Sequence, residues 1–239
     1  SVIYDENGDM VAELGATIRE NVSYNELPQI LVDAFVAVED SRFFEHNGFD
    51  VPRFTKALLS NIKTRSFSQG GSTFTMQLVK NTYFSNDEEG TTASRKGLSG
   101  VARKVQEIAL AMELEKSNEI NKRTILELYL NKINFGGNRN IRGVQKASEY
   151  YFGKDVSELN LAESAMLAGI INAPNAYNPF NNLELATERR NQVLYLMNYH
   201  GYISNDEYKL AKNIKVEDLL VDYSKNNSSG SVSPYQAYI

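Results

Sequence analysis

The apolar residues of this chain recur mainly at helical spacing. Between residues 27 and 38 they occupy positions 27, 30, 31, 34, 35 and 38, the three-and-four spacing of one buried helical face. Another helix is expected to open at Asp50 and Pro52 and to run to about Lys63, because an Asx cap followed by proline suits a first turn. Further helical patterns cover residues 73–83, 98–116, 119–132, 141–151, 161–171, 183–199 and 206–212.

Residues 1–14 have a different pattern. Two short apolar segments flank Asn7-Gly8, which is the strongest short signal for a β-hairpin. We therefore predict a mainly α-helical fold with a short N-terminal β-hairpin. Capping-box spacing supports two of the helix starts, at Asn160 with Glu163 and at Ser204 with Glu207.

Composition along the chain suggests its organisation. Residues 86–92 are polar, contain glycine and lack an apolar period, so they predict a loop. Residues 224–230 have the composition of a linker. We expect the hairpin and a linker over residues 1–22, one folded domain over 23–220 and a second linker over 221–239.

Overall composition excludes several kinds of site. The chain has 239 residues, of which 42% are hydrophobic, as in an ordinary globular protein. Its net charge of −5 disfavours nonspecific nucleic-acid binding. It has no cysteine, which excludes thiol catalysis, and His46 and His200 alone cannot form a multi-histidine metal site. No stretch of 18 apolar residues predicts a spanning helix.

The segment from Glu39 to Gly48 places an acid, an arginine and an imidazole directly after an apolar helical stripe. We expect the helix to continue through this segment, so that Arg42, Phe43 and His46, three, four and seven residues after Glu39, share one side with it. Asn47-Gly48 then supplies a left-handed stop. A simpler interpretation is an exposed pair between Glu39 and Arg42, which contributes about 0 to 1 kcal/mol and has no further role.

A glycine-rich turn, residues 69–73, precedes the helix that carries Gln77 and Lys80. Bare glycine backbone and unpaired amides at a helix start suit a phosphate group. The simpler interpretation is a glycine turn with Ser72 or Thr73 as N-cap. Lys80 favours the phosphate interpretation, because an ammonium facing the same pocket can neutralise a diphosphate.

Glu107 lies four residues after Arg103 and three after Lys104, hence beside one or both on a helix. A charge lattice on a solvated face explains this spacing equally well. The helix is nevertheless largely apolar around Glu107, so we expect this carboxylate to be partly buried, where it needs a partner. Two such carboxylates, Glu39 and Glu107, suggest acid and base roles at a sugar.

These segments and two later ones form an ordered set of motifs. They stand as Glu39-Asp40-x-Arg42-Phe43-x-x-His46-x-Gly48-x-Asp50, Gln69-Gly70-Gly71-Ser72-Thr73-x-Thr75-x-Gln77-x-x-Lys80-Asn81, Arg103-Lys104-x-x-Glu107, Ile125-Leu126-Glu127-Leu128-Tyr129-Leu130-Asn131, and Tyr151-Phe152-Gly153-Lys154 followed by Ala173-Pro174-Asn175-x-Tyr177-Asn178-Pro179. The set resembles the motifs of peptidoglycan glycosyltransferases, the polymerase domains of class A penicillin-binding proteins. The resemblance extends from about Val2 to Leu220, and its motif order is highly specific.

The resemblance implies a lysozyme-like fold with a large head lobe, a smaller jaw lobe that touches the membrane, and a cleft between them. It implies polymerisation of lipid II into β-1,4-linked glycan, with inversion and release of undecaprenyl diphosphate. Glu39 is then expected to be the general base toward the acceptor hydroxyl, and Glu107 the second catalytic carboxylate. Substrate-binding roles are implied for Asp40, Arg42, His46, Gly71, Ser72, Thr73 and Gln77, and for three residues that hold or frame the diphosphate, Lys80, Arg103 and Lys104.

The resemblance also implies partners and a location. The partners are lipid II, the growing glycan strand, the bacterial cytoplasmic membrane and inhibitors of the moenomycin type, but not nucleic acid. We expect the outer face of that membrane, an anchoring transmembrane helix before Ser1 and a transpeptidase domain after Ile239. No cofactor is expected to be essential, although a divalent cation, Mg or Mn, can assist diphosphate departure. Candidates for the membrane-facing jaw are Phe54, Leu58, Leu59, Ile62 and Phe67, whose spacing also fits core packing.

Two features depart from the family pattern. Met76 stands where the family commonly has the first glutamine of a pair, which places one donor-side hydrogen bond in doubt. Residues 91–100 resemble an insertion, so Arg95 is not assigned to a position in the family. Two other functions share parts of the pattern: a lysozyme-type hydrolase, which does not need diphosphate cations, and a noncatalytic cell-wall binding or scaffold module.

Overall fold

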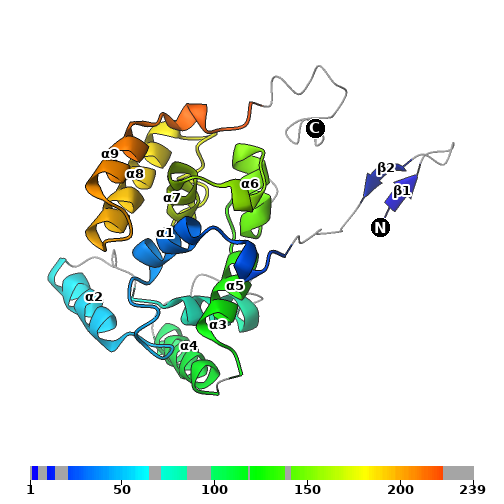
Figure 1. Ribbon diagram of the computed structural model, residues 1–239. Coiled ribbons are helices and arrows are strands. Elements are labelled where there is room, and N and C mark those ends of the chain that lie inside the picture. The colour runs from blue at the N-terminus through cyan, green and yellow to red at the C-terminus, as the bar shows by residue number, and fades with distance from the viewer. Residues whose placement is uncertain are drawn as a thin grey trace.

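The computed structural model describes residues 2–4, 10–13, 21–64, 71–84, 98–117, 119–137 and 141–222 (Figure 1). It is mainly helical, which confirms the predicted fold class. The helices are α1 (Gln29–Glu39), α2 (Val51–Thr64), α3 (Phe74–Tyr83), α4 (Leu98–Lys116), α5 (Lys122–Lys132), α6 (Val144–Phe152), α7 (Leu161–Ile170), α8 (Leu183–Tyr199) and α9 (Asn205–Asn213), with short 3-10 turns at Tyr24–Glu26, Val156–Glu158 and Val216–Asp218.

The larger core forms around α7, which packs against both α1 and α8 (Figure 1). From Ala162 to Ile170 every residue of α7 is buried, because most of its side chains are small or apolar and the carboxylate of Glu163 pairs with Lys154. Its start is fixed by the predicted capping box between Asn160 and Glu163, and the corresponding box of Ser204 and Glu207 begins α9. Both predictions of helix starts are therefore confirmed.

A second, smaller core lies between α3 and α4. It consists of Met76, Val79 and Ala111, with partly buried apolar residues around them. The opposite side of α3 contributes Phe74 and Leu78 to the larger core. Helix α3 is therefore shared by two clusters, and α4 lies on the side of it away from α8 and α9 (Figure 1). The arrangement agrees with the expected two lobes.

Two helices begin later than the periodicity predicted. Helix α5 begins at Lys122 rather than at residue 119, because the Asn121 side chain accepts a hydrogen bond from the Thr124 amide and caps the helix. Helix α6 begins at Val144, directly after Gly143, whose φ of 87° cannot belong to a right-handed helix. Local capping and backbone conformation override apolar spacing at both sites.

Several expectations lie wholly or partly outside the described residues. Strands β1 (Val2–Tyr4) and β2 (Met10–Glu13) pair antiparallel, but the turn between them is outside the description, so the Asn7-Gly8 hairpin stays a prediction. The loop at 86–92, Arg95 and the linker at 224–230 are also outside it, and the domain boundaries stay predictions. Within the described residues, no helix is long and apolar enough to cross a membrane.

Of the residues expected to face a membrane, two have described side chains. Leu59 on α2 is largely exposed, with 63% of its surface open, whereas Phe54 is half-buried. Phe54 packs against Phe49, with 5.2 Å between ring centroids. The side chains of Leu58, Ile62 and Phe67 lie outside the description. The membrane-facing role therefore stays a prediction, and core packing already explains Phe54.

Candidate active site

Helix α1 ends at Glu39, so the expectation of one helix from residue 27 through His46 is wrong. Asp40 leaves the helical conformation, with φ of −155° and ψ of 70°, and residues 41–48 form turns. Arg42 binds Glu45 at 2.9 Å and Asp50 at 3.5 Å. The simpler interpretation, an exposed pair between Glu39 and Arg42, is therefore also wrong.

The Asp40 carboxylate explains why the helix ends there. It is fully buried and accepts hydrogen bonds from His46 Nε2 at 3.0 Å, Arg53 Nη1 at 3.3 Å and the Phe74 amide at 3.2 Å. A buried carboxylate is costly unless donors surround it, and these three come from the following turn, from α2 and from the start of α3. Asp40 thus joins three segments directly beside Glu39.

Asp40 and His46 face the protein interior. The His46 side chain is buried and its ring binds Asp40. The contact between these two residues therefore fixes the conformation of the turn that follows Glu39. Their predicted contact with substrate is untested. Arg53, which completes the group around Asp40, was missed by sequence reasoning because a single arginine in an amphipathic helix carries no recognisable signal.

The start of α3 is occupied by protein contacts. Thr73 is the N-cap and accepts from the Met76 amide at 3.2 Å, while its own hydroxyl donates to the Gly48 carbonyl at 2.7 Å. The Phe74 amide is taken by Asp40. Because two of the first amides of α3 are already bound, a phosphate at this end of the helix would depend mainly on nearby cationic side chains.

Those cations come from α4. Lys104 Nζ lies 2.7 Å from Ser72 Oγ and 2.9 Å from Glu107 Oε2, and Arg103 Nε lies 3.5 Å from Glu107 Oε1. The Glu107 side chain is only 4% exposed, as predicted from the apolar surroundings. Both of its oxygens therefore face cations, which holds Arg103 and Lys104 in place at the surface of the smaller lobe.

Gly71 allows α2 to approach the turn before α3. A Cβ atom added at Gly71 would lie 3.1 Å from the Phe54 ring and 3.3 Å from Phe54 Cα.

Two residues of helix α3 differ in exposure. Lys80 is exposed on the last turn of α3, and within the described part of the chain no ion pair involves it. Met76 is fully buried in the smaller core, so it does not replace the hydrogen bond of a glutamine.

Glu39 itself is half-buried and is held by a neutral side chain. Gln77 Nε2 donates to Glu39 Oε2 at 2.9 Å, and the Tyr129 hydroxyl donates to Gln77 Oε1 at 3.2 Å. Burial raises the pKa of the Tyr129 hydroxyl well above its usual value, and the charges of Glu39 and Asp40 raise it further. Tyr129 was not predicted as a site residue, although a tyrosine within a buried stripe requires a hydrogen-bond partner.

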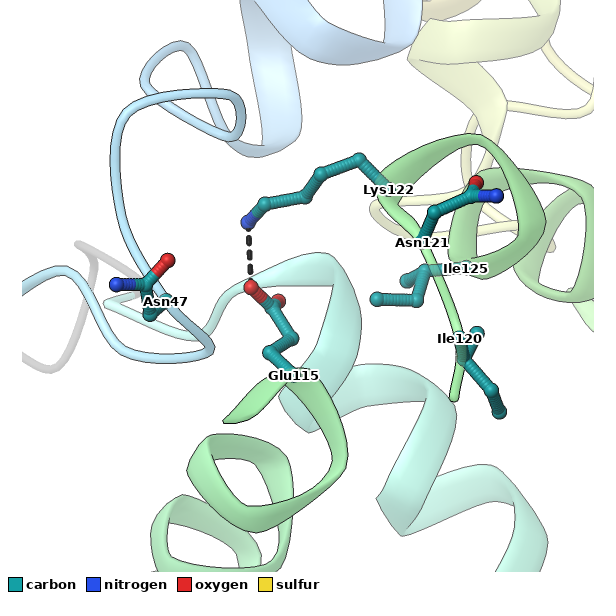
Figure 2. A pocket seen from close by; sticks show the side chains of 6 residues that line it. All are labelled: Asn47, Glu115, Ile120, Asn121, Lys122 and Ile125. Carbon is teal, nitrogen blue, oxygen red and sulfur yellow. Dashed lines mark ion pairs between the residues drawn. The ribbon is translucent and has the colours of Figure 1, made fainter. Parts of the chain in front are cut away.

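A separate pocket of about 240 Å³ lies beside the turn that contains His46. Figure 2 shows Lys122 and Glu115 pointing toward one another across it, with 2.6 Å between Nζ and Oε2. Lys122 Nζ also lies 2.6 Å from the His46 carbonyl oxygen, and the Thr75 hydroxyl donates to Glu115. The pocket contains none of the predicted site residues, and its ion pair links α4 and α5 to the turn. Its other lining residues are Asn47, Ile120, Asn121 and Ile125.

The described residues form no cluster of side chains that could bind a metal ion. Among them, no group of three or more His, Asp or Glu side chains could hold a metal ion. The divalent cation that the family resemblance implies stays a prediction.

Comparisons with known proteins agree on one family. The sequence profile described as Transglycosylase matches residues 7–198. The chain is 41% identical over 240 aligned positions to penicillin-binding protein 1A/1B of Bacillus subtilis, covering all of this chain and 25% of that protein. It is also 41% identical over 239 positions to penicillin-binding protein 1A of Streptococcus pneumoniae, covering 100% of this chain and 31% of that protein.

A crystal structure of penicillin-binding protein 1A from Haemophilus influenzae is 28% identical, with a TM-score of 0.49 over 89% of this chain and 20% of that one. The chain therefore spans about a quarter to a third of the length of the curated relatives named here. Because the family profile covers most of the sequence, the conclusion from it does not depend on the structural comparison. This chain belongs to the transglycosylase family.

Proposed function

We propose that this chain is a peptidoglycan glycosyltransferase that polymerises lipid II, with Glu39 as the general base. One observation carries the assignment: the partner of Glu39 among the described residues is the neutral Gln77 amide, whereas Glu107 is held by two cations. A base needs an oxygen that is not committed to a cation, and Glu39 meets this requirement better than Glu107.

The proposed reaction is a single inverting displacement. Glu39 takes the proton from the 4-hydroxyl of the acceptor sugar, and that oxygen attacks the anomeric carbon of the donor. A new glycosidic bond forms as the bond from that carbon to the diphosphate oxygen breaks, and the bonding electrons leave with undecaprenyl diphosphate. Diphosphate is a good leaving group, so it requires stabilisation of negative charge more than protonation.

The cationic residues serve this departure in the proposal. Lys104 and Arg103 are partly exposed but fixed on one side by Glu107, so their remaining donors can bind phosphate oxygens without a large loss of side-chain freedom. Lys80 is exposed on the last turn of α3, the helix that packs against α4, and in the proposal it adds a third positive charge. Glu107 therefore acts on the reaction by orienting cations. A divalent cation, where present, would supply further neutralisation.

The test is polymerisation by the purified chain with lipid II, detergent and magnesium, with products separated by size. We expect long glycan from the wild type and almost none from Glu39→Gln, since base catalysis contributes about 10²- to 10⁴-fold. Robust polymer from Glu39→Gln would overturn the assignment of the base. Cleavage of preformed glycan without polymerisation would instead identify a hydrolase, and the absence of both reactions would favour a binding or scaffold module.

A further inference from the structure

We propose that Tyr129 is a positioning residue that acts through Gln77 to keep Glu39 ready to accept a proton. The inference rests on the proposed function of Glu39 as the base. It concerns a side chain that has no role in the reaction described above. Three helices contribute, because Glu39 ends α1, Gln77 lies on α3 and Tyr129 lies on α5.

The contacts form a continuous chain of hydrogen bonds. The Tyr129 hydroxyl lies 3.2 Å from Gln77 Oε1, and Gln77 Nε2 lies 2.9 Å from Glu39 Oε2. Tyr129 is 1% exposed and its ring packs edge-on against Phe74, with 4.8 Å between ring centroids. The hydroxyl therefore has a fixed position from which to bind the Gln77 side chain.

The direction of these hydrogen bonds follows from chemistry. A carbonyl oxygen can only accept, so the bond between Tyr129 and Gln77 requires the phenol to keep its proton. The raised pKa of Tyr129 ensures this at neutral and mildly alkaline pH. With Oε1 of Gln77 committed to the phenol, its NH₂ group must point toward Glu39. An amide in the opposite orientation would present an oxygen to the carboxylate.

The orientation of the amide decides how Glu39 is held. A donated N–H stabilises the ionised carboxylate, whereas an amide oxygen at the same place would favour the protonated acid. Among the described residues no hydrogen bond reaches Glu39 Oε1, which is the oxygen that receives the proton in this proposal. Among the described residues, the titratable and charged groups beside this unit are Asp40 and the two side chains bound to it, His46 and Arg53.

A purely structural role for Tyr129 makes a different prediction. If the ring only fills the core beside Phe74, Tyr129→Phe should affect folding stability and leave the protonation of Glu39 unchanged. Tyr151 offers a matched control, because it is also fully buried and its hydroxyl donates to a backbone carbonyl, that of Phe135, at 2.9 Å. Tyr151→Phe removes the same atom from a buried hydrogen bond that does not include Glu39.

The experiment compares the wild-type chain, Tyr129→Phe and Tyr151→Phe in lipid II polymerisation as a function of pH. For Tyr129→Phe we expect kcat at neutral pH to fall about three- to tenfold, the value of one buried hydrogen bond, with KM nearly unchanged. The acidic limb of its pH–rate profile should move to higher pH. Tyr151→Phe should keep the wild-type profile. An unchanged profile in Tyr129→Phe, or equal shifts in both variants, would overturn the inference.

A second measurement separates this inference from the proposed function. Carboxyl-labelled glutamate can be followed by NMR through a pH titration of the same proteins, with the Glu39 signal assigned by Glu39→Gln. We expect the Glu39 signal to titrate at higher pH in Tyr129→Phe than in the wild type and in Tyr151→Phe. If the wild type makes no glycan, the proposed function fails and this titration still decides whether Tyr129 controls Glu39; identical titrations would overturn the positioning role.

Discussion

Lys104 donates to Ser72 with 2.7 Å between Nζ and Oγ, and this contact links α4 to the turn that precedes α3. The same ammonium lies 2.9 Å from Glu107 Oε2. One lysine therefore joins the second and third sequence motifs through a contact between residues that are 32 positions apart. It brings a fixed positive charge to the start of α3, where two of the first backbone amides are already bound.

Replacement of Lys104 tests whether this charge serves the leaving group. We expect Lys104→Met to lower kcat by about 10²-fold, because loss of one preorganised donor to a developing anion typically costs this much. Lys146→Met is the control, since Lys146 pairs with Glu149 on α6, away from these motifs in sequence. Polymerisation rates and thermal unfolding are measured for both. A Lys104→Met protein with the wild-type rate would show that the diphosphate is neutralised elsewhere.

The two glutamates are predicted to differ in their response to neutral substitution. Glu39→Gln should lower kcat by about 10²- to 10⁴-fold through loss of the base. Glu107→Gln keeps the shape that binds Lys104 and removes only the charge, so we expect a smaller fall of about tenfold, close to the value of one charge-assisted hydrogen bond. Parallel initial rates with lipid II measure both. Equal losses in the two variants would mean that Glu107 also takes part in proton transfer.

The helices of this protein were largely predictable, whereas the central turn of its site was not. Helix α8 follows the expected residues 183–199 because its signals are local: a cap at Asn182 and apolar residues at helical spacing. The end of α1 at Glu39 depends on what Asp40 binds. Its donors His46, Arg53 and Phe74 come from positions up to 34 residues away, and no local pattern contains that information.

In the candidate site, too, local features could be predicted from the sequence and long-range contacts could not. Burial of Glu107 could be inferred from its apolar neighbours on α4, and its pairing with Lys104 from their spacing. The link from Tyr129 to Gln77 spans 52 residues in sequence. A single sequence indicates that a buried tyrosine needs a partner but does not name that partner, so this part of the site required the structure.

Asp40→Asn is predicted to destabilise the fold. The substitution removes the negative charge that faces Arg53 and His46 in a fully buried position and leaves their donors poorly matched. Breaking a buried charge pair typically costs about 3 to 5 kcal/mol. Asp206→Asn is the control, because Asp206 and Lys209 form a largely exposed pair and such pairs contribute about 0 to 1 kcal/mol. Urea unfolding measures both, and equal midpoints would contradict a structural role for Asp40.

Gly48 and Gly201 provide a matched test of the contact between the turn after Glu39 and helix α4. Both glycines have positive φ, 84° and 79°, so alanine carries a similar conformational cost of about 1 to 2 kcal/mol at each site. A Cβ at Gly48 would lie 2.4 Å from the Ala111 carbonyl oxygen, whereas at Gly201 nothing lies within 4 Å. Backbone cannot yield as a side chain does, so Gly48→Ala should cost about 1 to 3 kcal/mol more than Gly201→Ala.

The same pair of variants separates stability from activity. The Gly48 carbonyl accepts the Thr73 hydroxyl that caps α3, so displacement of Gly48 should also disturb the start of the helix that carries Gln77. We therefore expect Gly48→Ala to lower both the unfolding midpoint in urea and the rate of glycan synthesis at temperatures where it remains folded. Gly201→Ala should lower only the midpoint. Equal stability of the two variants would show that α4 moves to accommodate the added carbon, and the contact between Gly48 and α4 would then not hold the turn in place.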